Sequence, residues 1–343
     1  MNVPSVSIIM SVYNGAQDAP LAVRSILEQT FGDFELIAID NGSLKDNTRT
    51  VLDRLARTDP RIRAVNLDTN IGLAGALNHG IGLARGRYIA RQDHDDISRP
   101  ERLAKQVAFM AANPSVGLLG PRAEIWAGDK PTGRFHDHAT GNAALQVDLL
   151  SNNPFVHTSI MTRKAVLEQV GLYTTDPARQ PPEDYDLWSR IARRHQIANL
   201  PDRLVVYREM AHSMSRDGAD PFLQKLIVIG AENIAFWNHR DRPDADCRAA
   251  ACLLHAAYDL IPPETRIEAV CQVLVTAVEA IGASDPGAGL DDRKAQLVAD
   301  ARHHFVHARK IPAWMEPLVA TAQRLPLSAG LRRQVMTWLA KSG

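Results

Sequence analysis

Short hydrophobic runs alternate with segments of helical periodicity over the first 120 residues of the chain. Five runs rich in β-branched residues, each followed by Gly, Asn or Asp, predict strands at residues 6–10, 34–40, 62–66, 88–92 and 116–120. Between them, apolar residues recur at helical spacing at residues 20–29, 46–57, 73–85 and 100–112. Because strands and helices alternate, we predict an α/β fold with a mixed, mainly parallel sheet covered by helices.

The pattern is less regular after Pro121. There we expect a loop-like stretch through His138, a helix at residues 143–150, a strand at 159–162, helices beginning at Lys164 and Glu183, and a closing strand at 204–207. The composition changes at residues 217–221, and from Phe222 onward only helical periodicity remains. We therefore predict one domain at residues 1–216, with halves of about 1–120 and 121–216, and an α-helical C-terminal region at residues 217–343.

Charge balance, cysteine count and the lengths of apolar runs exclude several classes of protein. Lys plus Arg equals Asp plus Glu at 39 each, so no overall positive field attracts nucleic acid. Three cysteines without metal-ligand spacing fit a reducing cytoplasm better than a disulfide framework. We expect neither a signal peptide at the N-terminus nor a membrane-spanning run of about 18 apolar residues, which leaves peripheral contact with the inner face of a membrane open.

Polar side chains close three of the predicted strands. They are Ser11, Tyr13 and Asn14 after the first strand, Asp40 and Asn41 at the second, and Asp93, His94, Asp95 and Asp96 after the fourth. Ligands of such sheets bind beyond the carboxyl ends of the strands, so we expect these groups to meet at one edge. An Asx-turn at residues 40–43 would explain the second group by structure alone.

The acidic group at residues 93–96 carries the clearest chemistry. Crowded carboxylates repel each other unless a cation holds them, and Mn²⁺ or Mg²⁺ bound by their oxygens would also bind a diphosphate. The structural alternative is an acidic turn in which Asp96 or Ser98 caps the next helix.

A second acidic pattern, Glu183-Asp184-Tyr185-Asp186-Leu187-Trp188, begins a helix after two prolines. Acidic residues in a first turn interact favourably with the helix dipole, which would explain the pattern structurally. The functional interpretation is that one carboxylate points into a cleft as a base. His136 and His138 resemble a metal-binding pair but suit a solvated loop better.

Several common nucleotide and hydrolase motifs are missing from the chain. It contains no G-x-x-x-x-G-K-[ST], no complete G-x-G-x-x-G after the first strand, no H-E-x-x-H and no G-x-S-x-G. Most triphosphatase, dinucleotide-binding and serine hydrolase functions are thereby excluded.

Taken together, the motifs resemble glycosyltransferase family 2, which has the Rossmann-like GT-A fold. The resemblance covers roughly the first 215 residues, in the family's order, at residues 6–14, 25–31, 34–43, 70–72, 76–78, 86–90, 93–96, 100–103, 157–159, 183–184 and 207–208. It implies a nucleotide-diphospho-sugar donor, a UDP-sugar first, Mn²⁺ or Mg²⁺, and inversion at the anomeric carbon. It also implies a saccharide or lipid-linked saccharide acceptor, as in the synthesis of bacterial surface polysaccharide or exopolysaccharide.

The resemblance also assigns residues by position. Donor-binding residues would be Ser11, Tyr13, Asn14, Asp40, Asn41, Asn70, Asp93, His94 and Asp95. Asp184 would be the catalytic base, with Glu183 beside it orienting the acceptor. The acceptor or sugar pocket would include His157, Asp96 and Trp188, and the metal ligands would be Asp95 and His212.

Two positions depart from the family pattern, and two other functions stay open. Asn41 stands where many members carry a second carboxylate, and Met210 stands where the pattern places a His, with His212 nearest. A nucleotidyltransferase acting on sugar phosphates would need a basic loop after the first strand, whereas residues 14–18 contain neither Lys nor Arg. The other alternative is a non-catalytic scaffold or saccharide-binding protein.

The helical C-terminal region has three possible uses. It could be a membrane-surface anchor, for which Arg332, Arg333 and Trp338 are suited. It could also form a homodimer contact or cover the catalytic domain.

Overall fold

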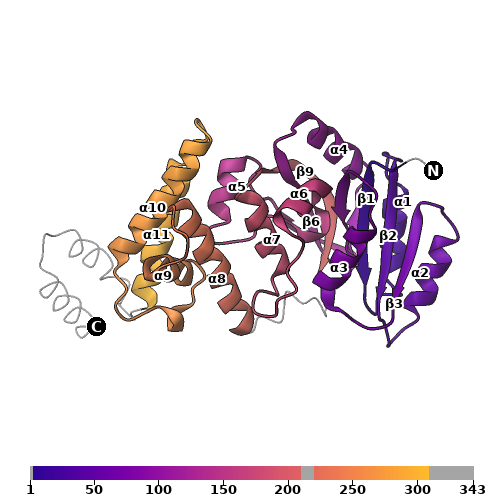
Figure 1. The fold of residues 1–343 in the computed structure, drawn as a ribbon, viewed down its shortest axis with the longest axis horizontal. Helices are drawn as coiled ribbons and strands as arrows, with labels where there is room; N and C mark the ends of the chain where they lie inside the picture. The colour runs from indigo at the N-terminus through magenta and orange to yellow at the C-terminus, as the bar shows by residue number, and fades with distance from the viewer. Residues whose placement is uncertain (1–2, 210–219, 309–343) are drawn as a thin grey trace, which may run out of the picture. The chain divides into compact units, whose positions relative to one another are not determined.

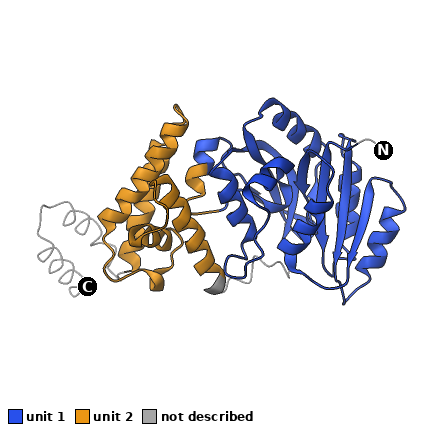
Figure 2. Cartoon of the chain, viewed as in Figure 1, with its two compact units in different colours: residues 1–145, 153–219 blue, residues 146–152, 220–343 orange. Residues whose placement is uncertain are grey.

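The computed structural model describes residues 3–209 and 220–308 (Figure 1). Two compact units divide the chain (Figure 2): unit 1 comprises residues 1–145 and 153–219, and unit 2 comprises residues 146–152 and 220–343. The sequence predicts the division after residue 216 and does not predict the early crossing at 146–152. His212, Met210 and the basic and aromatic residues near the C-terminus lie outside the described residues.

A nine-stranded sheet of described residues forms the centre of unit 1, in the order β3-β2-β1-β4-β8-β6-β9-β5, with β7 paired to β6. The strands are β1 (Val6–Val12), β2 (Phe34–Asn41), β3 (Ile62–Leu67), β4 (Tyr88–Arg91), β5 (Ile97–Ser98), β6 (Val116–Ala127), β7 (Lys130–His136), β8 (Met161–Arg163) and β9 (Gln196–Glu209). Strands β1 to β4 are parallel, β6 is parallel to β9, and the other pairs are antiparallel. The predicted mixed, mainly parallel sheet is confirmed.

Helices cover both faces of this sheet. They are α1 (Ala19–Leu27), α2 (Thr48–Ala56), α3 (Gly72–Leu83), α4 (Arg102–Ala112), α5 (Asn142–Asp148), α6 (Lys164–Val170) and α7 (Glu183–Ala192), with the 3-10 turn η1 (His157–Ser159). Even-numbered residues of β1, such as Ile8, share a buried core with α1, α2 and α4. On the other face a Cβ at Gly80 of α3 would lie 2.6 Å from Cγ2 of Ile9, so only glycine permits this close packing. Burial on both faces explains why the strands read as continuous hydrophobic runs.

Register brings the ends of the first strands together. Asp40 pairs with Val12 of β1 and with Asn66 of β3, so these parallel strands end side by side. Their polar closing residues are thereby placed on one edge, as the sequence predicts.

The sequence prediction is wrong between Pro121 and His138. Strand β6 continues to Ala127, turns at Gly128 with φ 59°, and returns as β7. Periodicity misses this hairpin because β7 is mostly exposed and the part of β6 beyond Pro121 is of mixed polarity, so neither has a continuous hydrophobic run. Strand β9 is also longer than predicted, because it pairs with β6 from Gln196 onward.

Unit 2 is helical among the described residues. Its elements are α8 (Asp220–Trp237), α9 (Ala245–Leu254), the 3-10 turn η3 (Tyr258–Leu260), α10 (Ile267–Ser284) and α11 (Asp291–Ala308). Helix α10 is long and apolar enough to cross a membrane by length and composition, with a mean hydropathy of 1.5, although the sequence analysis expects no such run. It contacts α8, α9 and α11 and buries residues such as Val270, Leu274 and Ile281, as the central helix of a helical bundle does.

Candidate active site

The loops after β1 and β2 are joined by hydrogen bonds at the carboxyl edge of the sheet. Asn14, with φ 53°, accepts the backbone N–H groups of Leu44 at 3.1 Å and Lys45 at 3.0 Å through Oδ1. Its own N–H donates to Ser43 Oγ at 2.9 Å. Asn14 therefore fixes the shape of this edge, and its contact with a donor stays a prediction.

Residues 40–43 form a turn closed by the side chain of Asp40, three residues along rather than the two of the predicted Asx-turn. The backbone N–H of Ser43 donates to Asp40 Oδ1 at 3.1 Å. Gly42 has φ 69°, and a Cβ there would lie 2.4 Å from the carbonyl carbon of Thr69. The turn thus brings the loop before α3 against the end of β2, and Asp40 stays on the edge where a donor is predicted.

Asn41 holds that loop with both ends of its amide. Its Nδ2 donates to Asn70 Oδ1 and to the carbonyl of Gly72, each at 3.2 Å, and its Oδ1 accepts from the N–H of Ile71 at 3.1 Å. A carboxylate at this position could not donate to the two acceptors. The local structure therefore accounts for asparagine at this position, which is one of the two departures from the pattern of the resemblance.

Three further predicted donor residues differ in accessibility. The ring of Tyr13 is 41% exposed and open to a ligand, whereas Ser11 is buried. His94 packs tightly over Gly15, where an added Cβ would lie 2.3 Å from His94 Cδ2. His94 therefore connects the acidic loop with the loop after β1.

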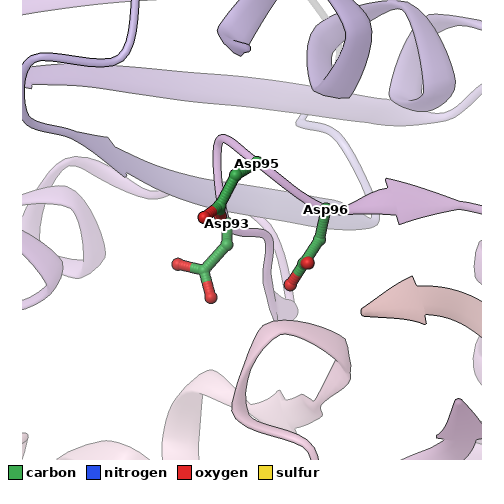
Figure 3. A group of neighbouring side chains, drawn as sticks. All are labelled: Asp93, Asp95 and Asp96. Carbon is green, nitrogen blue, oxygen red and sulfur yellow. The ribbon is translucent and has the colours of Figure 1, made fainter. Parts of the chain in front are cut away.

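The acidic loop after β4 brings three carboxylates together. Asp93, Asp95 and Asp96 each offer one oxygen within 4.8 Å of the others, and their carboxylates face the same region (Figure 3). Neither Asp96 nor Ser98 caps α4, whose N-cap is Glu101, so the capping interpretation is wrong.

Contacts on each side hold this cluster in place. Asp93 pairs with the buried guanidinium of Arg91, and its backbone N–H donates to Thr158 Oγ1 at 2.8 Å. Asp96 Oδ1 accepts the N–H of Arg208 at 2.7 Å, while its buried Oδ2 has no hydrogen-bond partner among the described residues.

The electrostatics of the cluster suit a divalent cation. Burial, reinforced by the charge of Asp93, raises the pKa of Asp95. Burial also raises the pKa of Asp96 well above its ordinary value, and the charges of Asp93 and Asp95 add to the effect. A cation among these oxygens would relieve the repulsion and occupy the unpaired Oδ2, so the residues fit a hard metal ion such as Mn²⁺ or Mg²⁺.

A second pair of carboxylates, Glu183 and Asp184, begins helix α7. Asp184 Oδ1 accepts the N–H of Tyr185 at 2.7 Å, and Oδ2 accepts from Asn153 Nδ2 at 2.8 Å. His157 lies close to both acids, with Nδ1 at 3.8 Å from Asp184 Oδ2 and 4.0 Å from Glu183 Oε1. Asp186, in contrast, is held by two arginines and has a structural role.

Burial makes this pair hold a proton near neutral pH. It raises the pKa of Glu183 to about 7, with the charge of Asp184 adding to the effect. Burial also raises the pKa of Asp184. The positive charge of Arg91 acts on both acids as well as on Asp93, so both acidic groups lie within electrostatic reach of one buried guanidinium.

Aromatic side chains support His157. Its Nε2 lies 3.0 Å from the hydroxyl of Tyr173, and its ring meets the edge of Trp188 at a centroid distance of 5.8 Å. Trp188 is fully buried, so it packs beneath His157 rather than lining an open pocket. Burial lowers the pKa of His157 well below its ordinary value, so the imidazole is neutral.

Several residues of this site escape sequence reasoning. Arg91, Asn153 and Tyr173 come from three separate segments, and only the fold brings them to the acids. Arg91 leaves a signal, because a basic residue is unusual in a buried strand. Arg208 stands among the motif positions of the resemblance, at residues 207–208, but without an assigned role. His136 and His138 stack on each other at 5.6 Å, away from any group of three potential metal ligands among the described residues.

Comparison with known proteins identifies the group to which this architecture belongs. Residues 7–171 match the family described as Glycosyl transferase family 2. An uncharacterised glycosyltransferase of Haemophilus influenzae is 32% identical over 245 residues, which cover 69% of this chain and 75% of the relative. The chain belongs to glycosyltransferase family 2. It is therefore a glycosyltransferase that uses a nucleotide-sugar donor.

Two other comparisons extend this family 2 assignment. The amylovoran biosynthesis glycosyltransferase AmsE of Erwinia amylovora is 32% identical over 205 residues, covering 59% of this chain and 75% of that protein. The crystal structure of S. aureus TarS 1–349 in complex with UDP-GlcNAc superposes with a TM-score of 0.59 at 17% identity, covering 89% of each chain. At that identity the likeness shows the GT-A fold alone.

Proposed function

We propose that this family 2 enzyme is metal-dependent and transfers a sugar, with inversion, from a nucleoside diphosphate to a hydroxyl of a saccharide or lipid-linked saccharide. The observation that carries the proposal is that two acidic groups lie within electrostatic reach of the buried Arg91. One group suits a cation, and the other holds a proton near neutral pH. Leaving-group stabilisation and proton removal need those two chemistries.

The cation would be held by Asp93, Asp95 and Asp96, and when bound it would supply positive charge for the leaving diphosphate. Tyr13 would stack on the nucleoside, and Asp40 would accept a hydrogen bond from it. Asp184 would take the proton of the acceptor hydroxyl. The acceptor oxygen then bonds to the anomeric carbon while the bond to the β-phosphate oxygen breaks, and the diphosphate leaves with the electron pair. A single displacement of this kind inverts the configuration.

The relatives support a proposal for the cellular role. AmsE is named for amylovoran biosynthesis, and TarS binds UDP-GlcNAc in its crystal structure. We therefore propose a UDP-sugar donor and a place in building a bacterial surface polysaccharide or exopolysaccharide. The enzyme would act in the cytoplasm, where nucleotide sugars are made, with its acceptor at the inner face of the membrane.

Calorimetric titration with UDP, GDP, dTDP and CDP, each with and without MnCl₂, tests the proposal. We expect one of the four nucleotides to bind, and to do so only with Mn²⁺. Equal binding without Mn²⁺ would refute the metal dependence. If none of the four binds, the non-catalytic scaffold becomes the better interpretation.

The pH dependence of kcat/KM follows from the acidic pair Glu183 and Asp184. Because the pKa of Glu183 is raised to about 7, this carboxyl takes up a proton as the pH falls through 7. The proton removes negative charge from beside Asp184, which makes Asp184 a weaker base for the hydroxyl proton. We expect kcat/KM to fall below pH 7 and to be constant above it until other groups titrate. The Glu183→Gln variant should move this fall to lower pH, since one titrating carboxyl is removed. A profile flat from pH 8 to pH 5 in the wild type would contradict the assignment.

A further inference from the structure

Arg208 lies one residue before the end of β9 and is almost completely buried, at 6% exposure. The sequence motifs give it no role. Its position is unusual because β9 meets the short strand β5, which directly follows the acidic loop. The positive charge of Arg208 is therefore placed next to the acidic loop.

The side chain of Arg208 ties together three separate segments. Its Nη1 donates to Asp18 Oδ1 at 3.1 Å, just before α1, and to the carbonyl oxygen of Asp95 at 3.0 Å. Nη2 donates to Asp129 Oδ1 at 2.8 Å, and Nε donates to the carbonyl of Gly128 at 3.1 Å, both in the β6–β7 turn.

Its backbone adds a contact to the acidic cluster. The N–H of Arg208 donates to Asp96 Oδ1 at 2.7 Å. One residue thus fixes the main chain of Asp95 and the carboxylate of Asp96. Because Oδ1 accepts from Arg208, the other oxygen of Asp96, Oδ2, which shares its surroundings with the Thr158 hydroxyl, is the one available to a ligand.

The guanidinium itself is not placed to bind phosphate. Four of its five N–H groups point at protein acceptors, and Asp18 and Asp129 pair with its charge. The planar fork of arginine suits such divergent contacts, whereas the single ammonium of lysine cannot make them together.

We propose that Arg208 is a positioning residue for the donor site: it holds Asp95 and Asp96 in the arrangement that binds the metal ion. This inference rests on the proposed function for its consequence in catalysis. Its structural part, the ordering of residues 93–97, does not depend on activity.

The test compares Arg208→Lys with Arg203→Lys. Arg203 lies on the same strand and also forms a two-bond fork, to Asp137 at 3.0 and 2.6 Å, but it is exposed and this fork does not involve the acidic loop. Hydrogen–deuterium exchange of peptides covering residues 92–98 is measured without metal. The MnCl₂ concentration for half-maximal transfer is measured alongside kcat at saturating MnCl₂.

In Arg208→Lys we expect exchange at residues 92–98 to be at least about ten-fold faster, with β1 and β2 unchanged. The MnCl₂ requirement should rise by about 10- to 100-fold, as when the support of a metal ligand is lost, while kcat at saturating MnCl₂ changes by less than about three-fold. Arg203→Lys should match the wild type in every measurement.

Unchanged exchange at residues 92–98 would overturn the inference, as would faster exchange throughout unit 1, which indicates general destabilisation. An unchanged MnCl₂ requirement despite a loosened loop would also overturn it. If the wild type neither binds MnCl₂ nor transfers sugar, the proposed function fails instead. The exchange result then still decides whether Arg208 orders the acidic loop.

Discussion

Replacing Asp184 with asparagine is expected to lower kcat by about 10³-fold, within the usual contribution of a general base. The substitution preserves size and an acceptor for the N–H of Tyr185, which bonds to Asp184 Oδ1. What it removes is the group that accepts the hydroxyl proton. Binding of the donor nucleotide should be unchanged, because the acidic cluster and the edge formed by β1 and β2 are untouched.

Initial rates of transfer and calorimetric binding of the nucleotide, measured on the same preparation, check this prediction. Asp68→Asn is the matched control, because it makes the same chemical change on a side chain that is 98% exposed. Turnover of Asp184→Asn within a few-fold of the wild type would show that another group removes the proton.

Asp95→Ala is expected to weaken Mn²⁺-dependent nucleotide binding by at least about 100-fold, since loss of a ligand's support alone costs 10- to 100-fold in metal affinity. Removing Asp95 also takes away like charge beside Asp96, whose pKa is raised partly by that charge. The variant should therefore fold as well as the wild type. Loss of binding would then report on the metal and not on stability.

Calorimetry at several MnCl₂ concentrations and thermal unfolding together check this second prediction. Asp137→Ala, which removes an exposed carboxylate that pairs with Arg203, is the control. If Asp95→Ala kept its full response to MnCl₂, the ligand role would move to Asp93 and Asp96.

The first half of unit 1 could be predicted closely from the sequence. Strands buried on both faces, such as β1 and β2, are hydrophobic throughout, and the helices between them are amphipathic, so their periods are unambiguous. The hairpin of β6 and β7 could not be predicted, because its stability comes from pairing with β9 and not from a local pattern.

The candidate site also has one part that the sequence predicts and another part that it does not. The acidic residues after β4 and at the start of α7 stand in recognisable local patterns. Their partners do not: Arg208 reaches Asp96 across 112 positions of sequence, and Asn153 reaches Asp184 across 31. Such contacts exist only once the sheet has formed, and no local property of the sequence encodes them.

Residues 146–152 belong to unit 2 but lie in the sequence between two stretches of unit 1. No single cut in the gene therefore separates the two units. Within unit 2, the carbonyl of Leu149 accepts from the buried Asn233 at 2.8 Å, and Asp148 pairs with Arg293. A chain shortened to residue 219 would keep this segment but lose both partners, leaving Leu149 and Leu150 uncovered. Exchange of the helical part between relatives by recombination after residue 219 would therefore require matching changes far upstream, so the two parts are expected to be inherited together.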